Sequence, residues 1–319
     1  MEEFAGLRHL FQTQEPVSIV PAPAALLREI GLRATIDHRV LVPVTGEESA
    51  ALADTAESLG AEVVRLMVHP GDSVEPELLE RWLREPAIDS LALVHSEPST
   101  GVLAPLEAIA GVMQRHPDLV LFVDAVDSLG ATPIRTDLWG LDFVLAASDG
   151  PLGLPPGLAF ATASPRLLAR THGLQGRGVM LDYRTHHTAA AEGTLVAELP
   201  PMLGPHLVRR LRELEGDGLE ALWNRYAHAA AMLAEWVNGR KDLSLVAREG
   251  RRSPTVSCFR LEDSRPATGV ADRLGALGWT VGITLMEGWV GLQVEHVGEA
   301  AIERMPALLT AMEEALRPG

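Results

Sequence analysis

The chain has 319 residues, of which 47% are hydrophobic and 22% are charged, so its composition is that of an ordinary globular protein and not of a disordered or fibrous one. Its 27 lysines and arginines against 43 aspartates and glutamates give a formal net charge of −16. This charge argues against nucleic acid or an anionic membrane as the main partner, because phosphate groups are bound by clustered cations. Lys241 is the only lysine, so any reaction that needs a lysine imine has one candidate.

The sequence carries few targeting or redox features. Cys258 is the only cysteine, so no intrachain disulfide is possible, and its apolar, strand-like surroundings favour a buried, unreactive thiol. The acidic N-terminus lacks the basic start and apolar stretch of a signal peptide. No charge-poor apolar segment approaches the roughly 20 residues that a membrane span needs. We therefore expect a soluble, cytoplasmic protein without a membrane partner.

Strand-like and helix-like patterns alternate in the first half of the chain. Buried strands are expected at 17–20, 40–44, 62–68, 90–95, 119–124 and 142–147, and helices at 47–59, 75–84 and 104–115. This alternation predicts an α/β fold with a mainly parallel sheet that is flanked by helices on both faces. Ligands of such sheets bind beyond the carboxyl ends of the strands, and Asp124 stands at the end of one predicted strand.

The second half has a different pattern. After Pro200-Pro201 and Gly204-Pro205, a long helix is expected over about 206–237. Short strands are expected at 243–246, 254–260, 280–283 and 289–294, with helices at 267–277 and 299–316. We therefore predict a large domain over residues 1–204 and a smaller C-terminal α/β domain, which includes the linking helix, over residues 205–319.

Five motifs follow one another along the chain. They are His95-Ser96-Glu97-Pro98-Ser99-Thr100-Gly101-Val102-Leu103, Val123-Asp124-Ala125-Val126-Asp127-Ser128-Leu129-Gly130, Trp139-Gly140-Leu141-Asp142, Leu154-Pro155-Pro156-Gly157-Leu158-Ala159-Phe160 and Arg252-Ser253-Pro254-Thr255-Val256. In these motifs the chain resembles the class V aminotransferases, in the alanine–glyoxylate and serine–pyruvate aminotransferase branch of the fold-type I pyridoxal phosphate enzymes. The resemblance implies the fold-type I architecture, pyridoxal phosphate as the family cofactor, and a dimer.

The resemblance gives roles to two positions. Asp124 matches the family aspartate that pairs with the protonated pyridine nitrogen of the cofactor. The family then has Ser-Gln-Lys before its Pro-Pro-Gly motif, and that lysine holds the cofactor as an imine. Here the residues are Ser148-Asp149-Gly150, so Gly150 occupies the lysine position and has no atom that can form an imine. Lys241 lies far away, in a polar turn of the predicted small domain.

Four other positions depart from the family pattern. The phosphate-binding Ser-Gly-Thr turn is replaced by residues 21–25, Pro-Ala-Pro-Ala-Ala, in which the prolines lack N–H donors. Glu48 falls near the aromatic residue that stacks on the cofactor ring, and Leu199 replaces the threonine that reaches the partner subunit's phosphate. Gln293 aligns with the arginine that clamps the substrate carboxylate, and an amide cannot supply the charged bidentate fork.

Ser99 and Ser128 remain with Asp124 as what we expect to be a vestigial cofactor pocket. Without a cofactor, Asp124 would have only hydrogen bonds to compensate its charge, so we expect Asp124→Asn to leave thermal stability unchanged or higher. Gly150→Lys alone is expected not to restore activity, because the parts of a catalytic site act as a unit.

These departures predict a class V aminotransferase-like protein that is inactive as a transaminase, takes no cofactor, and acts as a structural, regulatory or ligand-binding homologue. The alternative is a genuine aminotransferase-family enzyme that acts on small amino or keto acids and holds pyridoxal phosphate non-covalently or through other residues. No metal site is expected, because adjacent histidines such as His186 and His187 do not easily face one ion. The expected partner is a second copy of the chain, in a homodimer, or an active relative in a heteromer, and not nucleic acid.

Overall fold

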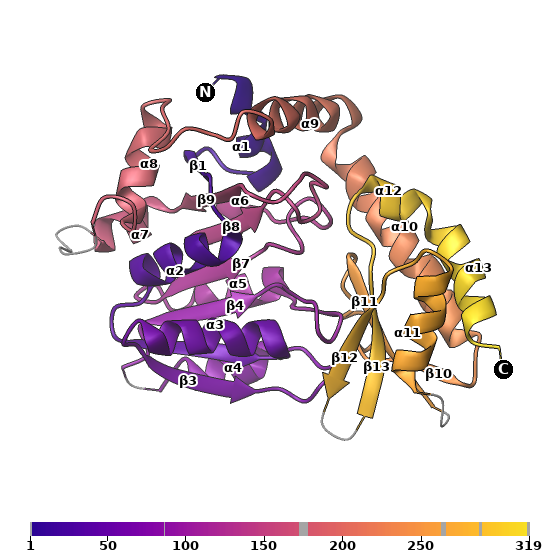
Figure 1. Cartoon of the computed structure of the whole chain (residues 1–319). Coiled ribbons are helices and arrows are strands. Elements are labelled where there is room, and N and C mark those ends of the chain that lie inside the picture. Colours follow the sequence, from indigo (N-terminus) through magenta and orange to yellow (C-terminus); the bar gives the residue numbers. More distant parts are fainter. Residues whose placement is uncertain (1, 86, 172–177, 263–265, 287–288, 318–319) are drawn as a thin grey trace.

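A computed structural model describes residues 2–85, 87–171, 178–262, 266–286 and 289–317. It contains a seven-stranded sheet in the first half of the chain and a four-stranded sheet in the second half, and two consecutive helices run between them (Figure 1). A two-stranded sheet of β5 (Ser96–Glu97) and β6 (Val102–Leu103) lies in the loop after the fourth strand.

The seven-stranded sheet is mainly parallel, as the sequence pattern predicts. Its order is β1 (Val17–Val20), β9 (Ala159–Ala163), β8 (Phe143–Ala147), β7 (Val120–Asp124), β4 (Ser90–Val94), β2 (Arg39–Val44) and β3 (Glu62–Met67). All neighbours from β8 to β3 are parallel, whereas β9 runs antiparallel to both β8 and β1.

Alternate side chains of the central strands enter two separate cores, because successive residues of a strand point to opposite faces. Leu121 and Val123 of β7 belong to one core and Phe122 to the other. The Phe122 core is covered by α2 (Ala24–Thr35), α3 (Glu47–Ser58), α7 (Pro165–Arg170) and α8 (Tyr183–Ala191). The opposite face packs against α1 (Gly6–Phe11), α4 (Pro76–Trp82) and α5 (Leu106–Met113). Short η1 (Glu2–Phe4) and α6 (Thr136–Trp139) complete this half.

Sequence analysis missed strand β9. Its residues, Ala-Phe-Ala-Thr-Ala, are all buried, but alanine has low strand propensity and the Pro155-Pro156-Gly157 segment before it reads as a turn. The strand forms because it fills the space between β8 and β1 and pairs with both.

The single long helix expected over 206–237 is wrong. The structure has two helices, α9 (Leu203–Asp217) and α10 (Leu219–Asn238). They are separated by Gly218, whose φ of 82° lies in the left-handed region that glycine adopts without steric penalty. The chain therefore turns between the two helices, as Figure 1 shows.

The second sheet is antiparallel, in the order β10 (Leu243–Leu245), β11 (Val256–Leu261), β13 (Trp289–Glu295) and β12 (Gly282–Met286). It packs against α11 (Ala267–Ala276) and α13 (Met305–Ala315), with Phe259 and Met312 in a core of its own. The helix expected over 299–316 is interrupted at Arg304, which separates α12 (Glu299–Glu303) from α13.

The boundary predicted at residue 204 stays a prediction. The packing adds that α9 and the first half of α10 contribute Leu207, Leu222 and Tyr226 to the core of the large sheet, whereas Leu233 and Val237 of α10 join the core of the small sheet. Cys258 is buried in β11, as expected. Within the residues that the structure describes, no helix is long and apolar enough to cross a bilayer.

Candidate functional site

The candidate site lies at the carboxyl edge of the large sheet. Asp124 is the last residue of β7. Ala159 pairs with both Val20 and Ala147, which places the ends of β1 and β8 at the same edge. Helix α2 begins there, after the Pro21-Ala22-Pro23 turn. This edge is where ligands of open α/β sheets bind.

Asp124 is held by a cation that the sequence did not reveal. Arg28, in the second turn of α2, donates from Nε to Asp124 Oδ2 at 2.6 Å, and its Nη2 lies 2.5 Å from Glu48 Oε1. The other carboxylate oxygen of Asp124 accepts the Val126 N–H at 3.1 Å. The expectation that Asp124 has no cationic partner is therefore wrong.

The Arg28 ion pairs are largely shielded from water. The side chains of Arg28 and Asp124 are 12% and 2% exposed, and that of Glu48 is 37% exposed. Burial by itself lowers the pKa of Arg28, but the charges of Asp124 and Glu48 outweigh this effect and raise that pKa overall. The guanidinium thus stays charged, and Asp124 and Glu48 share one cation.

Next to these ion pairs lies a cavity of about 440 Å³. Its walls come from the β1–α2 turn, the loop after β7, the loop between β8 and β9, and the end of β13, and its lining residues are Ala22, Pro23, Ala24, Val126, Asp127, Asp149, Gly150, Pro156, Gly157, Leu158, Glu295 and Val297. The charged groups of this lining are Asp127, Asp149 and Glu295, which we call the acidic trio. Among the described residues that line the cavity there is no basic side chain.

Asp127 is the most perturbed member of the acidic trio. Burial, followed by the negative charges of Asp124, Glu295 and Glu48, raises the pKa of Asp127 to about 7. Asp149 and Glu295 are exposed and lie at the rim. The cavity therefore combines exposed carboxylates with a half-buried one whose charge is not neutralised by Arg28.

Gly150 lines this cavity, and the backbone around it leaves no room for a side chain. A Cβ atom at Gly150 would lie 2.1 Å from the carbonyl oxygen of Val126, far inside the contact distance of carbon and oxygen. Lys241 is exposed in the turn between α10 and β10. The residues present therefore do not fit pyridoxal phosphate in a lysine imine at this position.

Ser99 and Ser128 are not among the residues that line this cavity, and their assignment to a cofactor pocket stays a prediction. The Ser99 hydroxyl donates to Glu97 Oε1 at 2.7 Å and accepts the Glu47 N–H at 2.9 Å. Ser128 Oγ lies 2.9 Å from His95 Nδ1. Burial lowers the pKa of His95 to about 4, so its ring is neutral. Both serines have internal partners, which makes their roles structural.

Gln293, at the expected carboxylate-clamp position, also lies outside the cavity lining. Its Nε2 donates to Glu295 Oε1 at 3.1 Å. The amide thus contacts a member of the acidic trio, and the assignment of Gln293 to the carboxylate-clamp position stays a prediction.

No group of three or more potential metal-ligating side chains occurs among the described residues, His186 and His187 included. The His186 ring instead contacts the Met180 carbonyl oxygen at 2.9 Å.

Arg28 is the functional residue that sequence reasoning missed. A signal existed, because Glu48 and Asp124 were both assigned to one pocket and two neighbouring carboxylates need a cation or a proton. Asp127, Asp149 and Glu295 were read only as parts of motifs. The structure shows that these three residues line one cavity, because the ends of β7, β8 and β13 lie close together.

Comparison with known proteins places these features in context. Residues 25–272 match the family described as aminotransferase class V. The small subunit of a soluble hydrogenase from Synechococcus sp. is 30% identical over 263 residues, which cover 79% of this chain and 67% of that protein. Alanine–glyoxylate aminotransferase 1 of Saccharomyces cerevisiae is 30% identical over 230 residues, which cover 66% of this chain and 58% of that protein.

A solved structure extends the likeness to the whole fold. The alanine–glyoxylate aminotransferase from Nostoc sp. superposes with a TM-score of 0.91 at 28% identity, covering 99% of this chain and 86% of that one. Such a match confirms the α/β, fold-type I architecture expected from the motifs.

These comparisons overturn the expectation that the chain takes no cofactor. The matching family and its aminotransferase relatives are pyridoxal phosphate-dependent, so this cofactor belongs to the chemistry of the family. The structure of this chain bears on the mode of attachment, since Gly150 offers no amine for a covalent bond.

Proposed function

Since the chain belongs to the class V aminotransferase family, we propose that it is a member that does not transaminate through a lysine imine and that binds a small cationic molecule in the acidic cavity. The observation that supports this proposal is that Gly150, at the position where the motifs lead us to expect the family's lysine, offers no amine and lines a cavity whose charged residues are carboxylates.

The charge of the cavity supports a cationic ligand. Asp127 and Asp149 come from two loops and Glu295 from the end of β13, and all three line one cavity. A cation about 4 Å from one carboxylate gains roughly 4 kcal/mol of Coulomb energy at an effective dielectric constant of about 20, and an anion would lose a similar amount. The Pro21-Ala22-Pro23 turn adds few N–H donors that could offset this for a phosphate.

The volume and the walls of the cavity indicate which class of cationic molecule it could bind. Its volume of about 440 Å³ suits a small molecule. Val126, Leu158 and Val297 provide apolar walls between the acidic groups. A short aliphatic chain with an amino group at each end, a linear diamine, matches both the apolar walls and the separated carboxylates.

Titration calorimetry with diaminobutane tests the binding half of the proposal. We expect saturable binding that weakens about tenfold in Asp149→Asn and in Glu295→Gln, a loss of about 1.4 kcal/mol for each charge. Glu77→Gln, an exposed glutamate of α4 far from the cavity in sequence, is the matched control and should bind like the wild type. Absence of binding, or equal affinity in all variants, would overturn it.

The pH dependence gives a second signature of the same site. Because burial and neighbouring carboxylates raise the pKa of Asp127 to about 7, this group must lose its proton before it can pair with an amine. Diamine affinity should therefore rise between about pH 6 and pH 8 and become flat in Asp127→Asn.

The claim that the chain does not transaminate through a lysine imine is tested with pyridoxal phosphate added to the purified protein. We expect no borohydride-trapped adduct on Lys241 and no transfer of an amino group from alanine or serine to glyoxylate. Turnover above the rate of free pyridoxal phosphate would refute this half and support the alternative, an aminotransferase that holds its cofactor without a lysine.

A further inference from the structure

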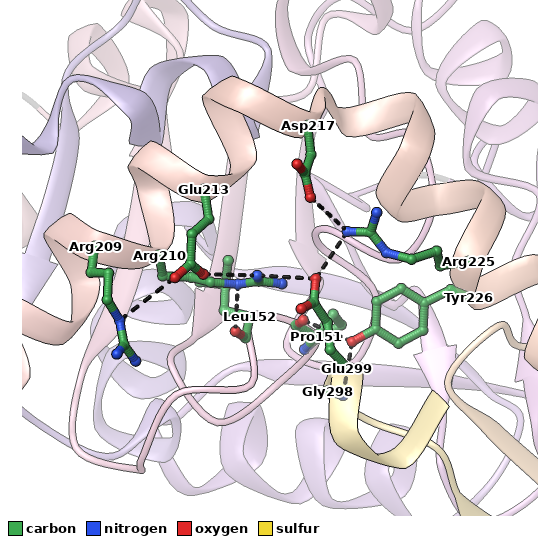
Figure 2. A network of polar contacts seen from close by, with 10 residues as sticks. All are labelled: Pro151, Leu152, Arg209, Arg210, Glu213, Asp217, Arg225, Tyr226, Gly298 and Glu299. Atoms are coloured by element: carbon green, nitrogen blue, oxygen red, sulfur yellow. Dashed lines mark hydrogen bonds and ion pairs between the residues drawn. The ribbon is translucent and has the colours of Figure 1, made fainter. Parts of the chain in front are cut away.

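One buried hydroxyl connects two walls of the acidic cavity. Tyr226, in α10, is fully buried and donates from its phenol oxygen to the Pro151 carbonyl at 2.8 Å. The same oxygen accepts the Gly298 N–H at 2.9 Å (Figure 2). Burial raises the pKa of Tyr226 to about 12, so the group keeps its proton and can donate and accept at once.

Each of these two contacts is close to a member of the acidic trio. Pro151 follows Asp149 by two residues in the β8–β9 loop, and Gly298 follows Glu295 by three residues after β13. The hydroxyl therefore connects the backbone that carries Asp149 to the backbone that carries Glu295.

Backbone contacts show how closely the two walls approach. A Cβ at Gly153 would lie 3.2 Å from the Gly298 Cα, and both glycines have positive φ, 65° and 83°. The β8–β9 loop is also tied internally, since Gly153 N–H donates to Gly150 O at 2.9 Å and Leu154 N–H donates to Ser148 O at 2.9 Å. The loop can thus shift only as a unit.

Charged groups reinforce the same junction from the two helices. Arg210 of α9 is 7% exposed, and its Nε donates to the Leu152 carbonyl at 3.1 Å. Its Nη1 pairs with Glu299 Oε1 at 3.1 Å, and Arg225 Nη2 pairs with the same oxygen at 2.9 Å (Figure 2). Arg210 and Arg225 reach Glu299 through its side chain. Tyr226 instead contacts the backbone of Pro151 and the backbone of Gly298 with one oxygen atom.

We propose that Tyr226 is a positioning residue whose hydroxyl fixes the separation of Asp149 and Glu295 and thereby sets the length of the diamine that the cavity selects. This inference rests on the proposed function for the identity of the ligand. The positioning itself rests on the contacts of the hydroxyl alone.

Tyr226→Phe removes the hydroxyl and keeps the ring in the core. Tyr183→Phe is a matched control, because Tyr183 is the only other tyrosine of the sequence and is equally buried. Its hydroxyl donates to the Ala161 carbonyl at 3.0 Å, in β9. A general effect of deleting a buried phenol oxygen should appear in both variants, whereas a positioning effect should appear only in Tyr226→Phe.

Calorimetry with linear diamines from diaminopropane to diaminohexane measures the selectivity. We expect the wild type and Tyr183→Phe to prefer one chain length by about tenfold over its neighbours, and Tyr226→Phe to lose most of this preference. A Tyr226→Phe variant that keeps the wild-type length profile would overturn the inference.

Amide hydrogen exchange separates the positioning from the ligand. We expect exchange in segments 149–153 and 296–300 to rise at least about tenfold in Tyr226→Phe and to stay unchanged in Tyr183→Phe. If no diamine binds the wild type, the proposed function fails, and the exchange result still decides whether Tyr226 connects the two walls. Unchanged exchange in Tyr226→Phe would refute the positioning role, whatever the ligand.

Discussion

At the scale of single residues, the ion pair with Arg28 changes the expected contribution of Asp124 to stability. An aspartate at the end of β7 could be a relic that only hydrogen bonds compensate, but the Arg28 Nε lies 2.6 Å from its carboxylate. Removing one member of a buried pair leaves the other charge without compensation, which is strongly destabilising. The same substitution that looked harmless from the sequence should therefore be costly.

We predict that Asp124→Asn lowers the free energy of unfolding by about 2 to 3 kcal/mol, somewhat below the usual cost because Glu48 still pairs with Arg28. Thermal denaturation should show a melting temperature lower by roughly 5 to 10 °C. Arg33→Gln, which breaks the more exposed Arg33–Glu29 pair on the same helix α2, should cost less than about 1 kcal/mol. Equal losses in both variants would contradict the special role of the Arg28 pair.

For Asp127 we predict the opposite effect, namely that its substitution raises the free energy of unfolding. Its pKa is about 7 in the folded chain, against an ordinary value of 3.8, so the folded state holds a proton that the unfolded state releases. Stability then falls as the pH rises from about 4 to about 7 and is constant above that range. Asp127→Asn removes this penalty.

At about pH 7.5, Asp127→Asn should raise the free energy of unfolding by about 1 to 2 kcal/mol, less than the whole pKa difference would give because the group is only half-buried. The gain should vanish as the pH approaches about 4, which denaturation curves at several pH values will show. Asp272→Asn, on the exposed face of α11, should have no such pH dependence. A gain independent of pH would speak against a titrating Asp127.

At the scale of elements, the loop between β8 and β9 supplies Asp149 and Gly150 to the lining of the cavity. It follows the last parallel strand, bends back into the antiparallel β9, and packs Gly150 against the Val126 carbonyl. The backbone of this loop therefore occupies the space that a side chain at residue 150 would need.

We predict that Gly150→Lys will not form an imine and will also destabilise the fold. Gly150→Ala isolates the steric part and should lower the free energy of unfolding by about 2 kcal/mol, since the added Cβ would sit 2.1 Å from a carbonyl oxygen. Gly111→Ala, in helix α5 with no atom within 4 Å of the added Cβ, is the control and should stabilise by about 0.5 to 1 kcal/mol. An unfolding free energy for Gly150→Ala at or above that of the wild type would show that the loop can yield.

At the scale of the whole molecule, the homodimer remains a prediction. A groove of about 950 Å³ lies between Phe4 of η1, the segment before α9 and the first turns of α9, and its lining combines apolar residues such as Leu199 and Val208 with charged ones such as Arg209 and Glu213. Met202, in the same segment, is 68% exposed. Apolar surface of this kind is rarely left in water, and a two-fold interface would cover it.

Sedimentation at micromolar concentration should therefore give a dimer. Met202→Asp should weaken the dimer at least about tenfold, because it would bury a carboxylate in an apolar contact. Leu138→Asp, at a side chain that is 67% exposed on α6, is the control and should leave the assembly unchanged. A monomeric wild type, or equal effects of the two substitutions, would exclude this groove as the interface.

Local sequence patterns determined where most strands of the large sheet lie. Short continuous apolar runs located β1, β2, β4, β7 and β8 to within two residues, because a strand that is buried on both faces needs apolar side chains over its whole length. The sequence also shows directly that residue 150 is a glycine, which has no amine, and this identity is the basis of the proposal that the chain does not use a lysine imine.

Only the tertiary structure decided which charges surround Asp124 and which side chains line the cavity. Arg28 and Asp124 are 96 positions apart, and nothing in the local period of either segment requires them to pair. Asp127 and Asp149 lie in the loops after β7 and β8, and Glu295 is the last residue of β13. The hydroxyl of Tyr226, in a helix, contacts the segments that follow Asp149 and Glu295. Local propensity acts over a few residues, whereas charge and shape act through space. The lining of the cavity was therefore set when the ends of strands that are distant in the sequence came together.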